Sequence, residues 1–118
     1  MPAHLDKGRR GEDLAAQLLL NKGYALVARN YRAGRGEIDL IVRKENLLVF
    51  VEVKTRTNLA FGMPETAVSK RKAALITQAA DAYIFATDWR GNIRFDIVAV
   101  VFRPGTPQEV AHFEDAFY

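Results

Sequence analysis

The sequence predicts a mixed α/β domain in which helices pack against a single sheet, with the element order α-β-β-β-α-β. Two observations lead to this class. Apolar residues recur at helical spacing in two separate segments, and four other segments show the alternation or the β-branched apolar runs of strands. One sheet covered by helices is the architecture that buries both kinds of apolar face.

Two helices are predicted from the spacing of their apolar residues. In the first, over residues 12–23, Leu14 and Leu18 are four positions apart and Gly23 is placed to end the helix. The second covers residues 70–86, with Ser69 in the position of its N-cap.

Four strands are predicted over residues 24–32, 37–43, 47–56 and 93–102. The turn Ala-Gly-Arg-Gly at residues 33–36 separates the first two, and Gly62 and Pro64 mark residues 58–66 as a loop. The tail from about residue 104 is less regular, although residues 109–118 can pack as an extension of the sheet.

Length and composition restrict the class of protein further. The chain has 118 residues, which is the length of one domain, and we expect a single domain over residues 1–118. It contains no cysteine, which excludes disulfides and thiolate ligands. No run approaches the ~20 apolar residues of a membrane span, and the N-terminus lacks the apolar segment of a signal peptide. We therefore expect a cytoplasmic protein with no membrane partner.

The second and third strands are predicted to form a hairpin in which Glu45 and Asn46 make a two-residue turn. One face then pairs Asp39 with Glu52, Glu37 with Lys54, and Ile41 with Phe50. The other face is wholly apolar and pairs Ile38 with Val53, Leu40 with Val51, and Val42 with Val49. A slip of one residue would place apolar side chains opposite charged ones.

Asp39 opposite Glu52 is the anomaly of this hairpin. Like charges directly opposite each other destabilise a strand pair, unless a cation lies between them. Mg²⁺ and Mn²⁺ prefer oxygen ligands, and Mg²⁺ is commonly held by one or two carboxylates together with water. Lys54, on the same face as Glu52, could position a metal-bound water or offset charge in a transition state. A solvated outer face is the alternative, and residue chemistry alone leaves both open.

The segments GEID and VFVEVK resemble the D-x(n)-(D/E)-x-K signature of the restriction-endonuclease-like superfamily, with Asp39, Glu52 and Lys54 in its three places. Together with GEDLAAQLLLNKGY, RNYR, FGMPETAVSKRK and RFD, they resemble the YraN-type family of small bacterial proteins, from about Gly8 to Val101. The resemblance implies a restriction-endonuclease-like mixed sheet flanked by helices and a nuclease site that uses Mg²⁺ or Mn²⁺.

Further metal-site candidates are the carbonyl of Val53, as an additional ligand, and the carboxylate of Glu12. Glu12 resembles the helix glutamate of archaeal Holliday-junction resolvases, which implies that it points at the metal. The alternative is a first-turn acid favoured by the helix dipole. Glu37 and Gln78 are weaker candidates, and His112 is expected to be solvated or locally bonded rather than catalytic.

The candidates for phosphate binding are basic residues around the hairpin and at the start of the second helix: Arg35, Arg56, Lys70, Arg71 and Lys72. A guanidinium can grip two phosphate oxygens. Positive charge in the first turn of a helix is unfavourable, and a bound phosphate would account for it. Surface solubility is the alternative reading for each of these residues.

The expected function is divalent-metal-dependent endonucleolytic hydrolysis of DNA, with RNA as the less favoured substrate. Phosphate contacts carry little sequence information, so we expect selection of DNA structure rather than of sequence. The alternative is a catalytically silent nucleic-acid-binding module on a nuclease scaffold, and a third class is a protein-interaction adaptor that uses the apolar tail. A homodimer would bring two sites to a branched or double-stranded substrate, and the sequence leaves the oligomeric state open.

Overall fold

The computed structural model describes residues 3–57 and 68–117, so the loop predicted over residues 58–66 lies outside the described residues. The helices are α1 (Ala3–Asn21) and α2 (Lys70–Thr87). The strands are β1 (Ala25–Ala33), β2 (Gly36–Lys44), β3 (Leu47–Thr57), β4 (Asn92–Phe102) and β5 (Glu109–Phe113). The predicted mixed α/β class is confirmed, and the tail adds a fifth strand to the predicted order.

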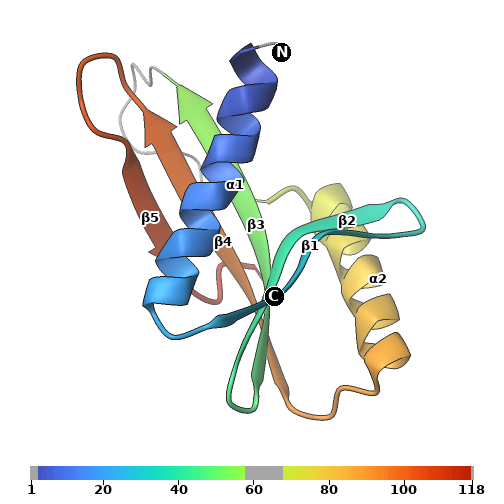
Figure 1. Ribbon diagram of the computed structural model, residues 1–118. Coiled ribbons are helices and arrows are strands. Elements are labelled where there is room, and N and C mark those ends of the chain that lie inside the picture. Colours follow the sequence, from blue (N-terminus) through green and yellow to red (C-terminus); the bar gives the residue numbers. More distant parts are fainter. Residues whose placement is uncertain (1–2, 58–67, 118) are drawn as a thin grey trace.

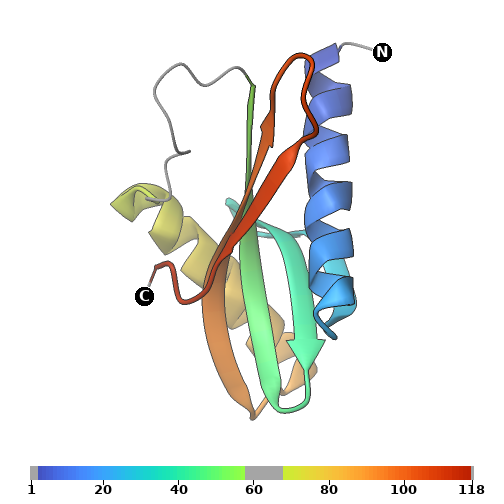
Figure 2. The same cartoon turned by 90° about the vertical axis from the view of Figure 1, so that its left-hand side faces the viewer.

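The strands form one sheet in the order β1-β2-β3-β4-β5, in which β3 and β4 are parallel and the other neighbours are antiparallel (Figure 1). The two helices cover opposite faces (Figure 2). The α1 core contains Ala15, Ala16 and Leu19 packed on Leu40, Val42, Val49, Val51, Val98 and Val100. The α2 core contains Ile76, Ala79 and Ala80 packed on Ile38, Ile41, Leu48, Phe50 and Phe95. Both faces of the central strands are therefore buried.

Both predicted helices exist, but α1 begins at Ala3, nine residues before the predicted start at Glu12. The prediction began where the apolar spacing begins, and the preceding charged residues provide no such pattern. The end is as predicted: Gly23 has φ +95° and the Tyr24 N–H donates back to the Leu19 carbonyl at 3.0 Å. In α2 the hydroxyl of Ser69 accepts a hydrogen bond from the Lys72 N–H at 3.1 Å, which confirms the predicted N-cap.

The predicted hairpin register is confirmed from Lys44–Leu47 to Leu40–Val51, and it ends there. The pairs expected beyond it, Asp39–Glu52, Glu37–Lys54 and Ile38–Val53, are wrong as strand pairs. Instead the Val53 N–H donates to Oδ2 of Asp39 at 2.7 Å, so a side chain takes the place of the next ladder partner.

The separation of β2 from β3 also changes which face its residues occupy. Ile38 lies in the α2 core with Ile41, whereas simple alternation would put it with Leu40 in the α1 core. β2 must therefore bend between these residues. Beyond the bend β2 pairs with β1 alone, and Figure 1 shows the β1–β2 hairpin swinging away from β3 toward α2.

A glycine allows the hairpin to approach α2 closely. A Cβ atom on Gly36 would collide with the backbone carbonyl of Leu75 and lie 3.1 Å from the Cβ of Ala79. Only glycine fits this contact without displacement of backbone. In the part of the chain that the structure describes, no helix is long and apolar enough to cross a membrane.

Candidate active site

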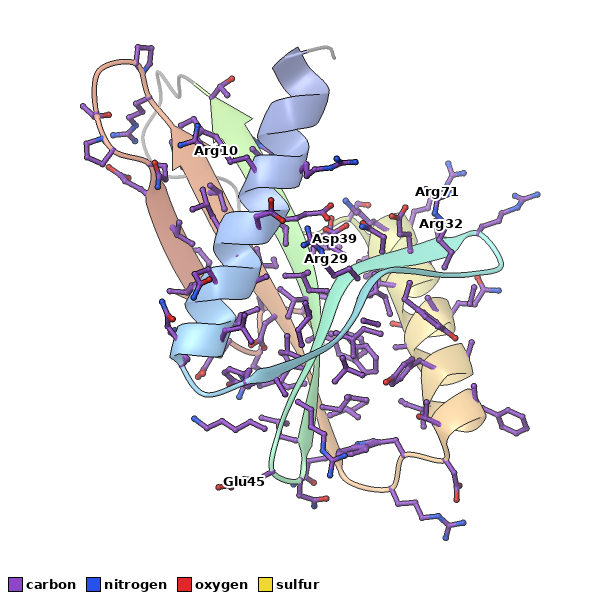
Figure 3. The ribbon with its side chains drawn as sticks, in the orientation of Figure 1. Arg10, Arg29, Arg32, Asp39, Glu45 and Arg71 are labelled. Atoms are coloured by element: carbon purple, nitrogen blue, oxygen red, sulfur yellow. The ribbon has the colours of Figure 1, made fainter. Side chains whose placement is uncertain are left out.

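Asp39 and Glu52 come close to each other at the fork where β2 leaves β3. Figure 3 labels Asp39 at this position. Asp39 is the first residue of β2 outside the ladder with β3, and it bonds to the backbone one residue beyond Glu52. The Glu52 side chain is only 6% exposed. The fork thus holds two acids from adjacent strands in a largely desolvated position, without the direct strand pairing that the sequence predicts.

The electrostatics of the fork disfavour the ionised form of Asp39. Burial, followed by the negative charge of Glu52, raises the pKa of Asp39 to about 7, and the charge of Glu12 contributes in the same direction. The hydrogen bond from Val53 and the charge of Lys72 act against this rise without cancelling it. The fork therefore brings Asp39 close to two other acids, Glu52 and Glu12, with the charge of Lys72 opposing them.

Lys72 supplies a counter-charge to this region. Its Nζ forms an ion pair with Oε1 of Glu52, reaching from the first turn of α2 across to β3. The Lys72 side chain remains 53% exposed, whereas its partner is buried. This contact explains why the start of α2 tolerates one positive charge, and the sequence analysis missed it because the two residues are distant in the chain.

Lys54 follows Glu52 by two positions on β3, so the two side chains leave the strand on the same face. Lys54 is buried, with 8% of the residue exposed. The predicted triad of Asp39, Glu52 and Lys54 therefore comes from two neighbouring strands.

Glu12 lies beside this region in the middle of α1, so the first-turn interpretation is wrong. Its Oε1 accepts hydrogen bonds from Arg29 at 3.4 Å and from Asn30 at 3.3 Å, both on β1. Its charge acts on Asp39, which places the two acids in one electrostatic region. The sequence analysis missed these two β1 partners, although both belong to the quoted segment RNYR.

An open cavity of about 710 Å³ adjoins the fork on the α1 side. Its lining residues are Arg9, Glu12, Asp13, Arg29, Asn30, Arg32 and Glu37. Glu37 lies 3.5 Å from Arg32, its partner across the β1–β2 ladder, and not opposite Lys54. This predicted weak candidate therefore belongs to the cavity wall.

The other basic candidates surround the fork at greater exposure. Arg35 is exposed in the β1–β2 turn, and Lys70 and Arg71 are exposed at the start of α2. Arg56 is half-buried, and its Nη1 donates to the Thr55 carbonyl at 3.0 Å. Gln78 faces Gly34 in the hairpin turn, with its Nε2 3.2 Å from where a Cβ would lie. In the part of the chain that the structure describes, the Gln78 side chain therefore lies against the hairpin turn rather than against Asp39 or Glu52.

The oxygen atoms at the fork suit a hard divalent cation that takes few of its ligands from the protein. Among the described residues, no group of three His, Cys, Asp or Glu side chains is placed to hold a metal ion. Asp39 and Glu52 provide two carboxylates, which is the number that commonly holds Mg²⁺ with its remaining waters. The N–H and C=O of a strand residue point to the same edge, so the Val53 carbonyl faces the fork as its N–H does.

A second buried polar cluster lies at the edge of β4, centred on Asp96. Arg94 donates to both Asp96 oxygens at 2.8 Å, and Nε2 of His112 lies 2.7 Å from Oδ2. The His112 side chain is 2% exposed, so of the two expected states, solvated or locally bonded, the solvated one is wrong and the side chain is bonded to Asp96. Arg94 and Asp96 are two positions apart on β4 and therefore share one face, so the sequence could have predicted their ion pair. No local pattern predicts that His112 is the third member of the cluster.

The residues of the fork fall within a known protein family. The model described as "Uncharacterised protein family UPF0102" matches residues 11–100. This chain belongs to that family. The match includes Glu12, Asp39, Glu52, Lys54 and Lys72, and it confirms the resemblance to the YraN-type family.

Individual UPF0102 proteins from several bacteria resemble the chain over nearly their whole length. A UPF0102 protein of Flavobacterium psychrophilum is 43% identical over 118 residues, which are 100% of this chain and 98% of the relative. One from Phocaeicola vulgatus is 41% identical over 100% of this chain and 97% of its own length. One from Clavibacter michiganensis is 45% identical over 91% of this chain and 92% of its own. The UPF0102 name assigns no activity, so function must be argued from the fork itself.

Proposed function

We propose that the protein is a divalent-metal-dependent endonuclease that hydrolyses phosphodiester bonds of DNA, with Asp39 and Glu52 as the metal ligands. The observation that supports this most directly is the convergence of two desolvated acids from adjacent strands at a fork. Burial and the neighbouring Glu52 raise the pKa of Asp39 to about 7, and a cation bound between the two carboxylates would relieve this cost of ionisation. Mg²⁺ or Mn²⁺ fits this set of oxygen donors.

Each residue of the fork has a distinct role in this proposal. The bound ion would polarise the scissile phosphate and lower the pKa of a bound water. Oδ2 of Asp39 accepts a hydrogen bond from the Val53 N–H, which fixes the orientation of the carboxylate. Its other oxygen would then be available to coordinate the metal ion. Lys54 orients the attacking water or stabilises the developing charge on the phosphate. Glu12, held by Arg29 and Asn30, acts as a positioning residue on the α1 side.

The basic residues around the fork hold the DNA backbone in this proposal. Arg35, Lys70 and Arg71 are exposed at the hairpin turn and the start of α2, and Arg56 follows the triad on β3. Such residues read phosphates and not bases, so we propose selection by DNA structure. Two copies of the chain would address a branched substrate, and light scattering that shows only a monomer would remove this two-site arrangement.

The second candidate function is a nucleic-acid-binding module that does not cleave. One observation favours it: the ammonium of Lys72 forms an ion pair with Glu52. The buried carboxylate therefore has a counter-charge from the protein itself and does not need a metal ion. This candidate predicts salt-sensitive DNA binding that persists in EDTA. Loss of all DNA binding on chelation would count against it.

Cleavage assays with matched variants test the proposal. Purified protein is incubated with linear, single-stranded, flapped and four-way DNA in Mg²⁺ or Mn²⁺, beside Asp39→Asn, Lys54→Ala and the control Asp88→Asn. Asp88 is an exposed acid beyond the end of α2, so its variant should cleave normally. Asp39→Asn and Lys54→Ala should each lose about 10²-fold or more of the rate. Equal cleavage by all preparations would indicate a contaminating nuclease and refute the assignment.

A further inference from the structure

We infer that a second phosphate-binding site lies at the far end of the sheet, between the N-terminal half of α1 and the β4–β5 hairpin. A cavity of about 390 Å³ opens there, and its polar lining residues are Arg10, Thr57, Arg103, Thr106 and Gln108. Two are guanidinium groups, the others are neutral hydroxyl and amide groups, and none is acidic. Figure 3 places Arg10 near the ends of β3 and β4, away from Asp39.

Arg10 is oriented toward this cavity by an aromatic ring. Its guanidinium carbon lies 5.3 Å from the ring centroid of Phe102, which is within the range of a cation–π contact. Phe102 itself lines the cavity at the end of β4. A side chain held in this way loses less conformational freedom when it binds an anion.

Arg103 provides the observation that points to a ligand. Its Nε is buried and has no hydrogen-bond partner, and it is the one such side-chain atom among the described residues. A buried donor without a partner costs free energy, and its presence requires an explanation such as a bound acceptor. The Nη1 of Arg103 lies 3.4 Å from Glu109, a partly exposed pair that leaves the Nε unpaired.

The hairpin turn fixes the backbone of Arg103. Its carbonyl accepts hydrogen bonds from both the N–H and the hydroxyl of Thr106, each at 3.3 Å. Two guanidinium groups converging on one cavity favour a phosphate group, because its several oxygens accept paired N–H donors. The ligand class is therefore a phosphate group, carried either by a nucleic-acid strand or by a small molecule.

The position of the cavity favours the nucleic-acid strand, a step that rests on the proposed function. Thr57 in the cavity follows Glu52 of the fork by five positions along β3, roughly 16 Å at ~3.3 Å per residue. A nucleic acid bound at the fork would then bring a backbone phosphate to this cavity, a few nucleotides from the bond that is cut.

Binding of inorganic pyrophosphate to the full chain in EDTA tests the site without any cleavage. We expect the Arg103 Nε–H resonance to shift saturably in NMR spectra, and Arg103→Gln and Arg10→Gln each to weaken pyrophosphate binding on the order of tenfold. The matched control is Arg90→Gln, because Arg90 also pairs with an acid, Asp88 at 3.3 Å, at the other end of the molecule. Absence of a saturable shift, or an equal loss in the control, would overturn the site.

A second arm distinguishes the two sources of phosphate. DNA affinity is measured by fluorescence anisotropy over a series of salt concentrations in EDTA, and Arg103→Gln should lower the salt slope by about 1. An unchanged slope with pyrophosphate binding intact in the parent would overturn the nucleic-acid source and leave a site for a small phosphate ligand. Asp39→Asn should bind pyrophosphate normally, so failure of the cleavage proposal would not affect this site.

Discussion

At the scale of single residues, Lys72 would compete with the proposed divalent ion for the carboxylate of Glu52. The ammonium of Lys72 pairs with Glu52 in the protein, and a metal ion bound by Glu52 would weaken that pair. The released ammonium would then lie near the phosphate that the ion binds. If the fork binds a divalent ion as proposed, Lys72 would lower its affinity for that ion and would stabilise the fork when no ion is bound.

Replacing Lys72 by Met should separate these two effects. In EDTA the variant leaves Glu52 buried without its ammonium, so the free energy of unfolding in urea should fall by about 1–2 kcal/mol. Its affinity for Mn²⁺, measured by calorimetry, should rise because the ion no longer displaces a lysine. Lys70→Met is the control, since Lys70 is exposed in the same turn. Equal behaviour of the two variants would show that the ion pair contributes nothing.

The raised pKa of Asp39 predicts how stability depends on pH without metal. The pKa is about 7 in the folded protein and ordinarily 3.8, so the proton binds the folded state more tightly. This stabilisation is fully present below about pH 4 and is lost as the pH rises through about 7. In EDTA, the parent should therefore lose about 1–3 kcal/mol between pH 5 and pH 8 relative to Asp39→Asn. Parallel urea-unfolding profiles for the two proteins would contradict the shift.

At the scale of elements, the β1–β2 hairpin determines where Asp39 lies. Because β2 leaves β3 at Leu40, the remainder of the hairpin is supported by α2 through the close contact at Gly36. This contact keeps the two sides of the fork apart. The distance between the acids of β2 and β3 thus depends on how the hairpin packs on a helix.

Gly36→Ala should disrupt this packing. Its Cβ would collide with the carbonyl of Leu75, so the hairpin must move or α2 must shift, at a cost of about 1–3 kcal/mol. Gly8→Ala is the control within α1, where an added Cβ meets nothing within 4 Å. That change should be neutral or stabilise by about 0.5–1 kcal/mol. Thermal unfolding of both variants measures the difference, and a Gly36→Ala protein as stable as the parent would refute the contact.

At the scale of the whole molecule, the cluster around Asp96 joins distant parts of the chain. Besides its contacts with Arg94 and His112, Asp96 accepts a hydrogen bond from the Asp115 N–H at 3.0 Å. Arg94 also donates to the hydroxyl of Tyr24, which follows α1, at 2.8 Å. The tail then continues onto the α2 side, where Phe117 packs against Phe95. The tail is therefore packed on its own chain.

Asp96→Asn should loosen all of these connections at once. The change breaks the ion pair between the fully buried Asp96 and the half-buried Arg94, which keeps its 3.4 Å pair with Glu114. The free energy of unfolding should therefore fall by about 3 kcal/mol or more. Asp88→Asn, which alters an exposed pair with Arg90, should cost less than about 0.5 kcal/mol. Urea unfolding compares the two. A loss no greater than that of the control would mean that the cluster does not hold the molecule together.

The sequence by itself determined the two helices, the first four strands and the pairing at the hairpin turn. Apolar spacing located both helices, and Ser69 and Gly23 marked two of their ends. A slip of one residue would have set apolar side chains opposite charged ones, which favoured the observed register near Glu45 and Asn46. It also brought Asp39, Glu52 and Lys54 together as candidates. These features depend on residues within a few positions of each other, so the local sequence pattern is enough to predict them.

The tertiary structure alone decided how the candidates meet. The end of the β2–β3 ladder, the hydrogen bond from Val53 to Asp39 and the reach of Lys72 to Glu52 each depend on elements that are distant in sequence. The same is true of His112 on Asp96 and of the unpaired Nε of Arg103. The strand pattern of the sequence continues through Asp39 without interruption, and the bend in β2 is seen only from the packing of Gly36 and Ile38 on the α2 side.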